Sequence, residues 1–182
     1  MMNFLFRLLL TFNATSLLVI IYLVQKGQVP GVLGPVFELT IALPNMAWYV
    51  LYLAVPVILT GLSIALSSSL GKDSFKAGEV ASIEHANNSF LPSYLGYFFV
   101  ALSVPNWETL IFVYGVLFVF TFLSQALYFN PLFLLFGFEF YNITTKNGAS
   151  IFLISRQRYK TPLEVEVASA NRINDYTFIE RG

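Results

Sequence analysis

Four long apolar runs decide which folds this chain can adopt. They cover residues 4–24, 43–66, 90–104 and 107–129, and few charged side chains interrupt them. A helix needs about 20 mostly apolar residues to cross the hydrocarbon core of a bilayer. Hydrophobic residues make up 57% of the 182 positions and charged residues only 11%, less than half of the share typical of a soluble domain. The sequence therefore predicts an integral membrane protein.

The run at 90–104 is the shortest of the four. A helix of about 15 residues is about 22 Å long, whereas the hydrocarbon core is about 30 Å thick. Three alternatives remain open for it: an earlier start, a crossing with little tilt, or a re-entrant hairpin with 107–129 through Pro105 and Asn106. We expect residues 1–137 to form an all-α membrane bundle of four transmembrane helices.

The basic residues are distributed unevenly. With four crossings, nine of the ten Lys and Arg residues lie on the side of both termini, and only Lys26 lies on the other side. An excess of Lys and Arg marks the cytoplasmic side of a membrane protein. The sequence therefore predicts a multi-pass protein with both termini in the cytoplasm, and the same orientation holds if 90–104 and 107–129 are re-entrant.

Polar and small residues within the apolar runs have two interpretations. Asn13, Ser16 and Gln125 are the intramembrane polar candidates. They either form hydrogen bonds between helices or line a permeation path. Small residues recur every four positions at Gly61, Ala65 and Ser69, a stripe that lets another helix approach closely and predicts a helix-packing surface.

Residues 138–182 form a different kind of segment, for which we expect a small cytoplasmic β-sheet module of three or four strands. Asn147 and Gly148 are the favoured pair for a two-residue type I′ turn, which predicts a hairpin with Tyr141 opposite Ile154. Alternating residues at 163–168 and the segment 175–181 predict further strands. A sheet of this size buries too little apolar surface to stand alone, so it should dock on the helices, on a second copy or on another protein.

The polar stretch after the predicted hairpin is the candidate surface for a partner. Its charge and expected exposure single out Arg156, Arg158, Tyr159, Lys160, Glu164 and Glu166. The basic residues among them suit anionic membrane lipid as well as an acidic partner. Three charges without interleaved aromatic residues do not predict direct binding of nucleic acid.

Catalytic and metal-binding patterns do not occur in the sequence. The single histidine, His85, follows Glu84 in the connection between the second and third apolar runs, where we expect the two to form a solvated pair. There is no cysteine and no second histidine to complete a metal site. We therefore expect no enzyme activity, cofactor or metal.

The four-span layout and the stretch "GFEFYNITTKNGASIFLIS", residues 137–155, resemble the membrane subunit of the bacterial Kiwa anti-phage defence system, the KwaA family. The resemblance implies a sensor and scaffold in the bacterial inner membrane that forms a homo-oligomer, a tetramer. It also implies recruitment of a cytoplasmic DNA-binding effector subunit, KwaB, and no catalytic residues. Two other classes stay open: a small oligomeric channel or holin-like pore, and the membrane anchor subunit of an enzyme complex.

Overall fold

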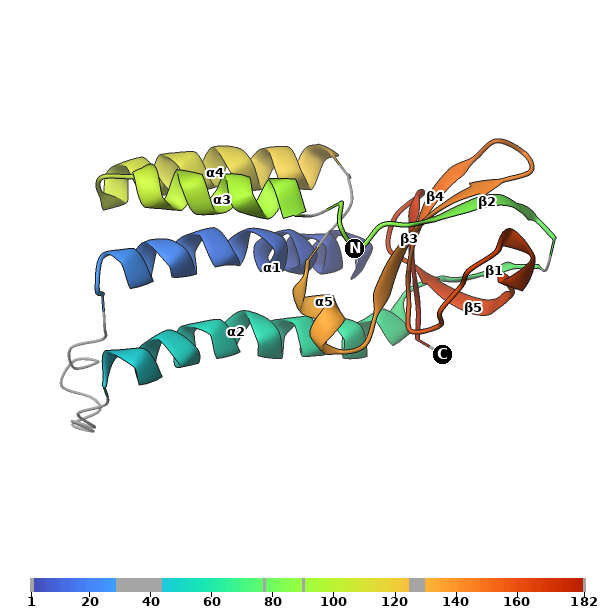
Figure 1. Cartoon of the computed structure of the whole chain (residues 1–182), viewed down its shortest axis with the longest axis horizontal. Coiled ribbons are helices and arrows are strands. Elements are labelled where there is room, and N and C mark those ends of the chain that lie inside the picture. Colours follow the sequence, from blue (N-terminus) through green and yellow to red (C-terminus); the bar gives the residue numbers. More distant parts are fainter. Residues whose placement is uncertain (1, 29–43, 77, 90, 125–129, 182) are drawn as a thin grey trace.

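The structure is a computed structural model that describes residues 2–28, 44–76, 78–89, 91–124 and 130–181 (Figure 1). A group of helices and a β-sheet follow one another along the long axis of the molecule. The four longer helices alternate in direction: α1 (Met2–Gln25), α2 (Asn45–Leu66), α3 (Leu91–Ser103) and α4 (Trp107–Ser124). The chain therefore enters and leaves the helical part at the end that carries the sheet.

Three helices are long and apolar enough to cross a membrane. They are α1, α4 and α2 together with the short 3-10 helix η1 (Ser67–Ser69) that continues it. Helix α3 has 13 residues and is therefore about 20 Å long. The predicted span at 90–104 is thus a short apolar helix, and a bundle of four transmembrane helices is not confirmed.

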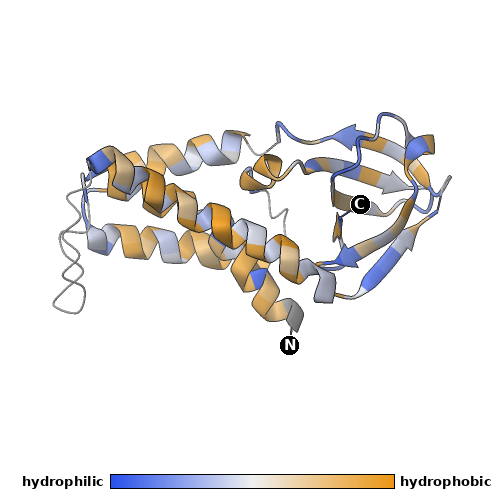
Figure 2. Cartoon of the chain, turned by 90° about the horizontal axis from the view of Figure 1, so that it is seen from below, coloured by the Kyte–Doolittle hydropathy of each residue, from blue (hydrophilic) through white to orange (hydrophobic). Residues whose placement is uncertain are grey.

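Helix α1 is the centre of the helical part, because α2, α3 and α4 each pack against it. Leu10, Ala14, Leu18 and Tyr22 are buried along α1 at intervals of four residues, which is one face of a helix. By contrast, only 6% of α4 is buried. Apolar residues cover the helices, whereas the sheet carries mixed polar and apolar residues (Figure 2).

The sheet has six strands in the order β1-β5-β6-β4-β3-β2, all antiparallel except the parallel pair of β4 and β6. Four strands come from the C-terminal segment: β3 (Glu139–Thr145), β4 (Ser150–Ser155), β5 (Val167–Arg172) and β6 (Thr177–Glu180). The other two, β1 (Lys72–Phe75) and β2 (Val80–His85), come from the connection between α2 and α3. The sheet therefore extends beyond the predicted segment 138–182.

These two strands form opposite edges of the sheet although they follow each other in the chain. Consecutive Cα atoms lie about 3.8 Å apart, so Phe75 and Val80 are at most about 19 Å from each other. A flat sheet of six strands is wider than this, because neighbouring strands are about 4.8 Å apart. The sheet is consequently curled, with its two edges drawn together at this end.

The curled sheet has an apolar core on each face. One face packs against the sheet-side ends of α1 and α2, where Phe140 and Ile154 meet Phe6, Leu10 and Ile64. Inside the curl, a second cluster includes Leu153, Val165, Val167 and Phe178. Of the three docking surfaces left open by the sequence, the structure shows the sheet packed on the end of the helices.

The hairpin of β3 and β4 differs from the predicted one by a single residue of register. Gly148 has a φ of +82°, and the Thr145 N–H donates to the Ala149 carbonyl at 2.9 Å, as in a three-residue loop with a bulge. Tyr141 is therefore opposite Leu153 instead of Ile154. A shift of one residue exchanges the two faces of a strand, so the predicted face of β4 is wrong.

The strand predicted at 163–168 is wrong for residues 163–166, because β5 begins at Val167. Pro162–Glu164 form the 3-10 helix η2, in which Thr161 and Glu164 make a capping box. Leu163 is 80% exposed, whereas Val165 and Val167 are buried. The predicted last strand is confirmed as β6.

Candidate functional site

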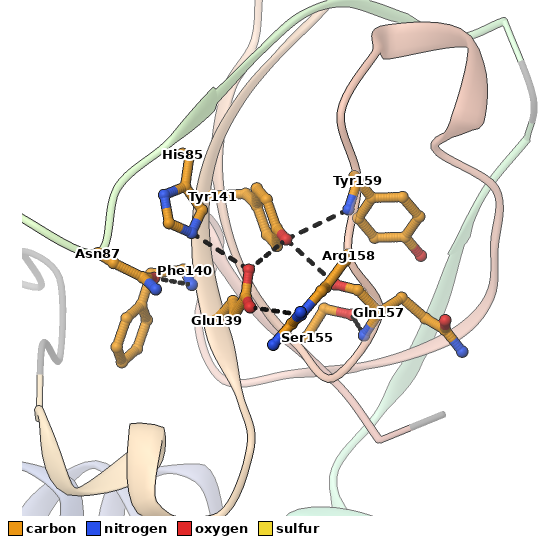
Figure 3. Close-up of polar contacts among 9 residues, drawn as sticks. All are labelled: His85, Asn87, Glu139, Phe140, Tyr141, Ser155, Gln157, Arg158 and Tyr159. Atoms are coloured by element: carbon orange, nitrogen blue, oxygen red, sulfur yellow. Dashed lines mark hydrogen bonds and ion pairs between the residues drawn. The ribbon is translucent and has the colours of Figure 1, made fainter.

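A polar cluster lies where β2, β3 and the loop after β4 meet (Figure 3). Glu139 is at its centre: one carboxylate oxygen is 2.9 Å from Arg158 Nε, and the other is 3.2 Å from His85 Nε2. The Tyr141 hydroxyl lies 2.9 Å from the same oxygen as His85. Glu139 thereby connects three segments of the chain through one side chain.

Strand pairing explains why these side chains meet. His85, the last residue of β2, is opposite Tyr141 of β3, and their ring centroids are 5.5 Å apart. Glu139 precedes Tyr141 by two residues, so it lies on the same face of β3. Glu84 is opposite Asn142 and lies on the other face. The expected pair of His85 with Glu84 is therefore wrong, and the partner of His85 is Glu139.

The loop after β4 is held by the same cluster. The Tyr141 hydroxyl lies 3.2 Å from the Gln157 carbonyl and accepts a hydrogen bond from the Tyr159 N–H at 3.2 Å. The Tyr159 hydroxyl donates to the buried carboxylate of Glu180 at 2.8 Å. These contacts fix both the backbone and one aromatic side chain of the loop.

The two tyrosines of the cluster are neutral hydrogen-bonding groups at physiological pH. Burial raises the pKa of Tyr141 to about 12, and the neighbouring Glu139 carboxylate also raises it. Burial, together with a hydrogen bond to Glu180, raises the pKa of Tyr159. Neither phenol is therefore poised to act as a base near pH 7.

A surface groove of about 590 Å³ opens over this cluster and is lined by Glu139, Tyr141, Arg158, Tyr159 and Lys160 among others. The Arg158 side chain is 82% exposed, and Lys160 is exposed as well. Within the described part of the chain, His, Cys, Asp and Glu do not form a group of three that could hold a metal ion. Chemically the groove offers cationic and hydrogen-bonding groups at its rim, which suit an acidic ligand or protein surface.

The residues expected to contact a partner do not all come together. Arg158, Tyr159 and Lys160 share the groove, but the guanidinium of Arg156 lies on the Phe138 ring, 4.7 Å from its centroid. Glu166 is exposed on the segment between η2 and β5.

Glu164 is exposed, but its carboxylate also forms hydrogen bonds with the backbone. Its carboxylate accepts hydrogen bonds from the N–H groups of Lys160 at 2.8 Å and Thr161 at 3.3 Å. The Lys160 bond is the main cause that lowers the pKa of Glu164. Glu164 therefore closes the turn that leads out of the groove.

The small-residue stripe of α2 is divided between the interior and the surface. At Gly61, a Cβ atom would lie 3.2 Å from the Phe136 ring, which follows the short helix α5 (Leu132–Leu135). Ala65 and Ser69 are exposed on the surface of the chain. Gly61 thus admits a close neighbour within one chain, whereas the other two positions lie on the surface.

The intramembrane polar residues form contacts within the helical part. Asn13 is fully buried, and its Nδ2 donates to Ser63 Oγ at 3.0 Å, which joins α1 to α2. The Ser16 hydroxyl donates to the Asn13 carbonyl at 2.8 Å. Gln125 lies outside the described residues. The contact of Asn13 agrees with the interpretation as a hydrogen bond between helices.

Glu139 and Tyr141 are members of the site that the sequence does not predict. Their role depends on the pairing of β3 with β2, which contributes His85 from more than fifty positions earlier in the chain. The alternation of Glu139, Tyr141 and Ile143 was visible, but it does not identify the neighbouring strand. Only the register brings these side chains together.

The chain was compared with known protein families, curated proteins and solved structures. The family described as "Anti-phage protein KwaA" matches residues 6–179, from α1 into β6. No curated protein and no solved structure matches the chain. The family match includes both the helices and all six strands of the sheet.

Proposed function

The chain belongs to the KwaA family of anti-phage proteins, and we propose that it is a non-enzymatic sensor and scaffold subunit of a defence complex in the bacterial inner membrane. Its helices anchor it in the membrane as a homo-oligomer, which we expect to be a tetramer. Its sheet lies in the cytoplasm and recruits a DNA-binding effector subunit, KwaB, which the resemblance implies as the partner.

The position of the sheet is the observation that carries this proposal. The sheet lies at the end of the helices where α1 begins, and Lys26 lies at the opposite end of α1 (Figure 1). Of the ten basic residues, only Lys26 belongs to that opposite end. Because Lys and Arg accumulate on the cytoplasmic side, this distribution supports a sheet that faces the cytoplasm.

Both edges of the sheet are continuous with membrane helices, which supports a role in sensing. Strand β1 begins three residues after η1, and β2 ends six residues before α3. A shift of α2 or α3 therefore acts directly on an edge strand, without a long flexible linker between them. We propose that events at the membrane reach the effector by this route.

The exposed helices support an oligomer. Helix α4 is apolar all round and only 6% buried, so most of its surface is available to lipid or to a neighbouring subunit. Asn13, which a pore would need in its lumen, is instead bonded to Ser63 inside one chain. We therefore favour the scaffold over the channel.

The groove over Glu139 is the surface that we propose for the effector. Arg158 and Lys160 are exposed cations on a loop whose backbone is held by Tyr141 and Glu164. A loop held in one conformation loses little conformational entropy when a partner binds. We therefore expect an acidic patch on the effector.

The test is co-purification of KwaB with the tagged chain from membranes. The double variant Arg158→Glu/Lys160→Glu reverses both rim charges, and we expect at least a tenfold loss of bound KwaB, because like charges across an interface repel. The matched control Lys76→Glu/Lys146→Glu reverses two exposed lysines in the turns at the other end of the strands and should retain the partner. Equal retention by both variants would contradict the proposed surface.

A further inference from the structure

A second polar pocket, of about 530 Å³, lies at the β1 edge of the sheet, and from its geometry we propose that it binds the headgroup of an anionic phospholipid. Its lining includes Ser68, Lys72, Arg156, Asn171, Glu180 and Arg181. This inference requires only that the chain lies in a membrane, and it does not depend on recruitment of the effector.

The strand register places part of this pocket on the side of the sheet that faces the helices. Lys72 of β1 is opposite Asn171 of β5, and Asn171 is opposite Ile179 of β6. Directly opposed residues point to the same face of a sheet. Ile179 belongs to the core between the sheet and the helix ends, so Lys72 and Asn171 are on the bundle-facing side as well.

The pocket lies at the depth of the lipid headgroups. The membrane helix formed by α2 and η1 covers 25 residues and is therefore about 37 Å long, several ångströms more than the hydrocarbon core. Its last turn, which includes Ser68, extends into the headgroup layer. Lys72 follows only three residues after the end of this helix.

Three basic side chains in the pocket have no carboxylate partner among the described residues. The ion pairs of the described residues involve His85, Arg158 and Arg172, but not Lys72, Arg156 or Arg181. The guanidinium of Arg156 is held on the Phe138 ring, which leaves its N–H groups available at the edge of the plane. Three cations at headgroup depth attract an anionic phosphate.

The pocket also contains one carboxylate, that of Glu180, which accepts hydrogen bonds from two hydroxyl groups. Glu180 is 7% exposed, and one of its oxygens accepts hydrogen bonds from the Ser155 and Tyr159 hydroxyls at 2.5 and 2.8 Å. The lining therefore keeps a net positive formal charge, because three basic residues outnumber this single acid.

Asn171 indicates which headgroup fits. It is 6% exposed, and its Oδ1 has no hydrogen-bond partner among the described residues. A buried polar group without a partner is costly, and a hydroxyl donor from a ligand would satisfy it. Phosphatidylglycerol supplies both a phosphate for the basic residues and hydroxyls for Asn171, whereas phosphatidylcholine supplies no hydroxyl.

The test is native mass spectrometry of the full chain in mild detergent, titrated with phosphatidylglycerol or phosphatidylcholine. We expect selective retention of phosphatidylglycerol. One basic residue near anionic lipid changes binding roughly fivefold, so Lys72→Gln/Arg156→Gln/Arg181→Gln should bind about a hundredfold more weakly. The matched triple variant Lys26→Gln/Lys76→Gln/Lys146→Gln removes equal charge elsewhere in the chain and should bind as the wild type does.

The double variant Lys72→Gln/Arg181→Gln keeps the contact of Arg156 with Phe138, so loss of that packing contact cannot account for weaker lipid binding. This variant should bind roughly twenty-five-fold more weakly. Glycerol phosphate, added alone, tests a soluble ligand of the same chemistry. Binding of glycerol phosphate as tight as that of the lipid would overturn the proposal. Equal weakening in the matched triple variant, or equal retention of phosphatidylcholine, would overturn it as well.

Discussion

Glu139 is a single side chain that joins three segments of the chain. It contacts His85 from β2, Tyr141 within β3 and Arg158 from the loop after β4. Because Arg158 is 82% exposed, its ion pair contributes at most about 1 kcal/mol to stability. Glu139 therefore contributes mainly by orienting the loop after β4. It does so largely through the Tyr141 hydroxyl, which contacts both Glu139 and the loop backbone.

The pKa of Tyr141 gives a measurable sign of this burial. Its value in the folded chain, about 12, is above the ordinary value of 10.0, so the folded state favours the neutral phenol. The stabilising contribution is present below pH 10 and is lost as pH rises through about 12. We expect the tyrosinate absorbance of wild type minus Tyr141→Phe to develop near pH 12.

A control for this titration is the same difference measured in denaturant, where the unfolded chain should return the ordinary tyrosine value. A difference signal that develops at the ordinary value in the folded protein would mean that Tyr141 is solvated. The groove would then lack the fixed loop that the proposed partner surface requires.

The local sequence predicts the positions of the helices better than those of the strands. The apolar runs of α1, α2 and α4 predict these helices, because a membrane span depends only on its own composition. Strands β3, β4 and β6 lie within the predicted β segment, but the bulge at Gly148 sets a register that the favoured turn pair alone does not predict. The local sequence is thus largely sufficient to predict the presence of membrane helices and a C-terminal β segment.

Strands β1 and β2 were not predicted, and their sequences explain why. The sequences "KDSF" and "VASIEH" have no apolar alternation, and most of their residues are exposed in the structure. They are strands because β5 and β3 offer them hydrogen-bonding partners from distant parts of the chain. The candidate site also depends in part on distant pairing. Its loop residues were predicted from the local sequence, whereas the role of Glu139 follows only from the pairing of β2 with β3.

The contact between α5 and α2 tests how the connection to the sheet is held. We expect Gly61→Leu to destabilise the protein by about 1–3 kcal/mol, because even a Cβ atom at this position lies 3.2 Å from the Phe136 ring. The measurement is the unfolding temperature in detergent. The matched control Ala65→Leu adds the same side chain one turn later, where α2 is exposed, and should leave that temperature nearly unchanged.

If both leucine variants unfolded at the wild-type temperature, the packing of Phe136 on Gly61 would be absent in the membrane protein. A change of oligomer mass confined to Ala65→Leu would assign the exposed part of the stripe, Ala65 and Ser69, to a contact between subunits.

The two ends of the molecule differ, because the helices lie at one end and the sheet lies at the other (Figure 1). We expect a fluorescent protein fused to the C-terminus to fluoresce in cells, because the sheet lies in the cytoplasm in our proposal. Alkaline phosphatase is active only outside the cytoplasm, so it should be inactive at the C-terminus and active when fused after Gln28. An active phosphatase at the C-terminus would exclude recruitment of a cytoplasmic effector.

The same reporter resolves the path of α3. Phosphatase fused after Asn106, in the short connection between α3 and α4, should be active if this connection reaches the far side of the membrane. An inactive fusion would instead identify α3 and the start of α4 as a re-entrant hairpin. The location of the C-terminus is the same in both cases.

The placement of β1 and β2 at the two edges of the sheet has a consequence for how the protein is made. The ribosome completes both edges well before β3 to β6, which fill the space between them, have emerged. At 5–20 residues per second this interval lasts about ten seconds. During that time two unpaired strands wait in the cytosol beside a half-inserted chain, so biogenesis should depend on chaperones, and a prematurely terminated product should be a target for proteolysis.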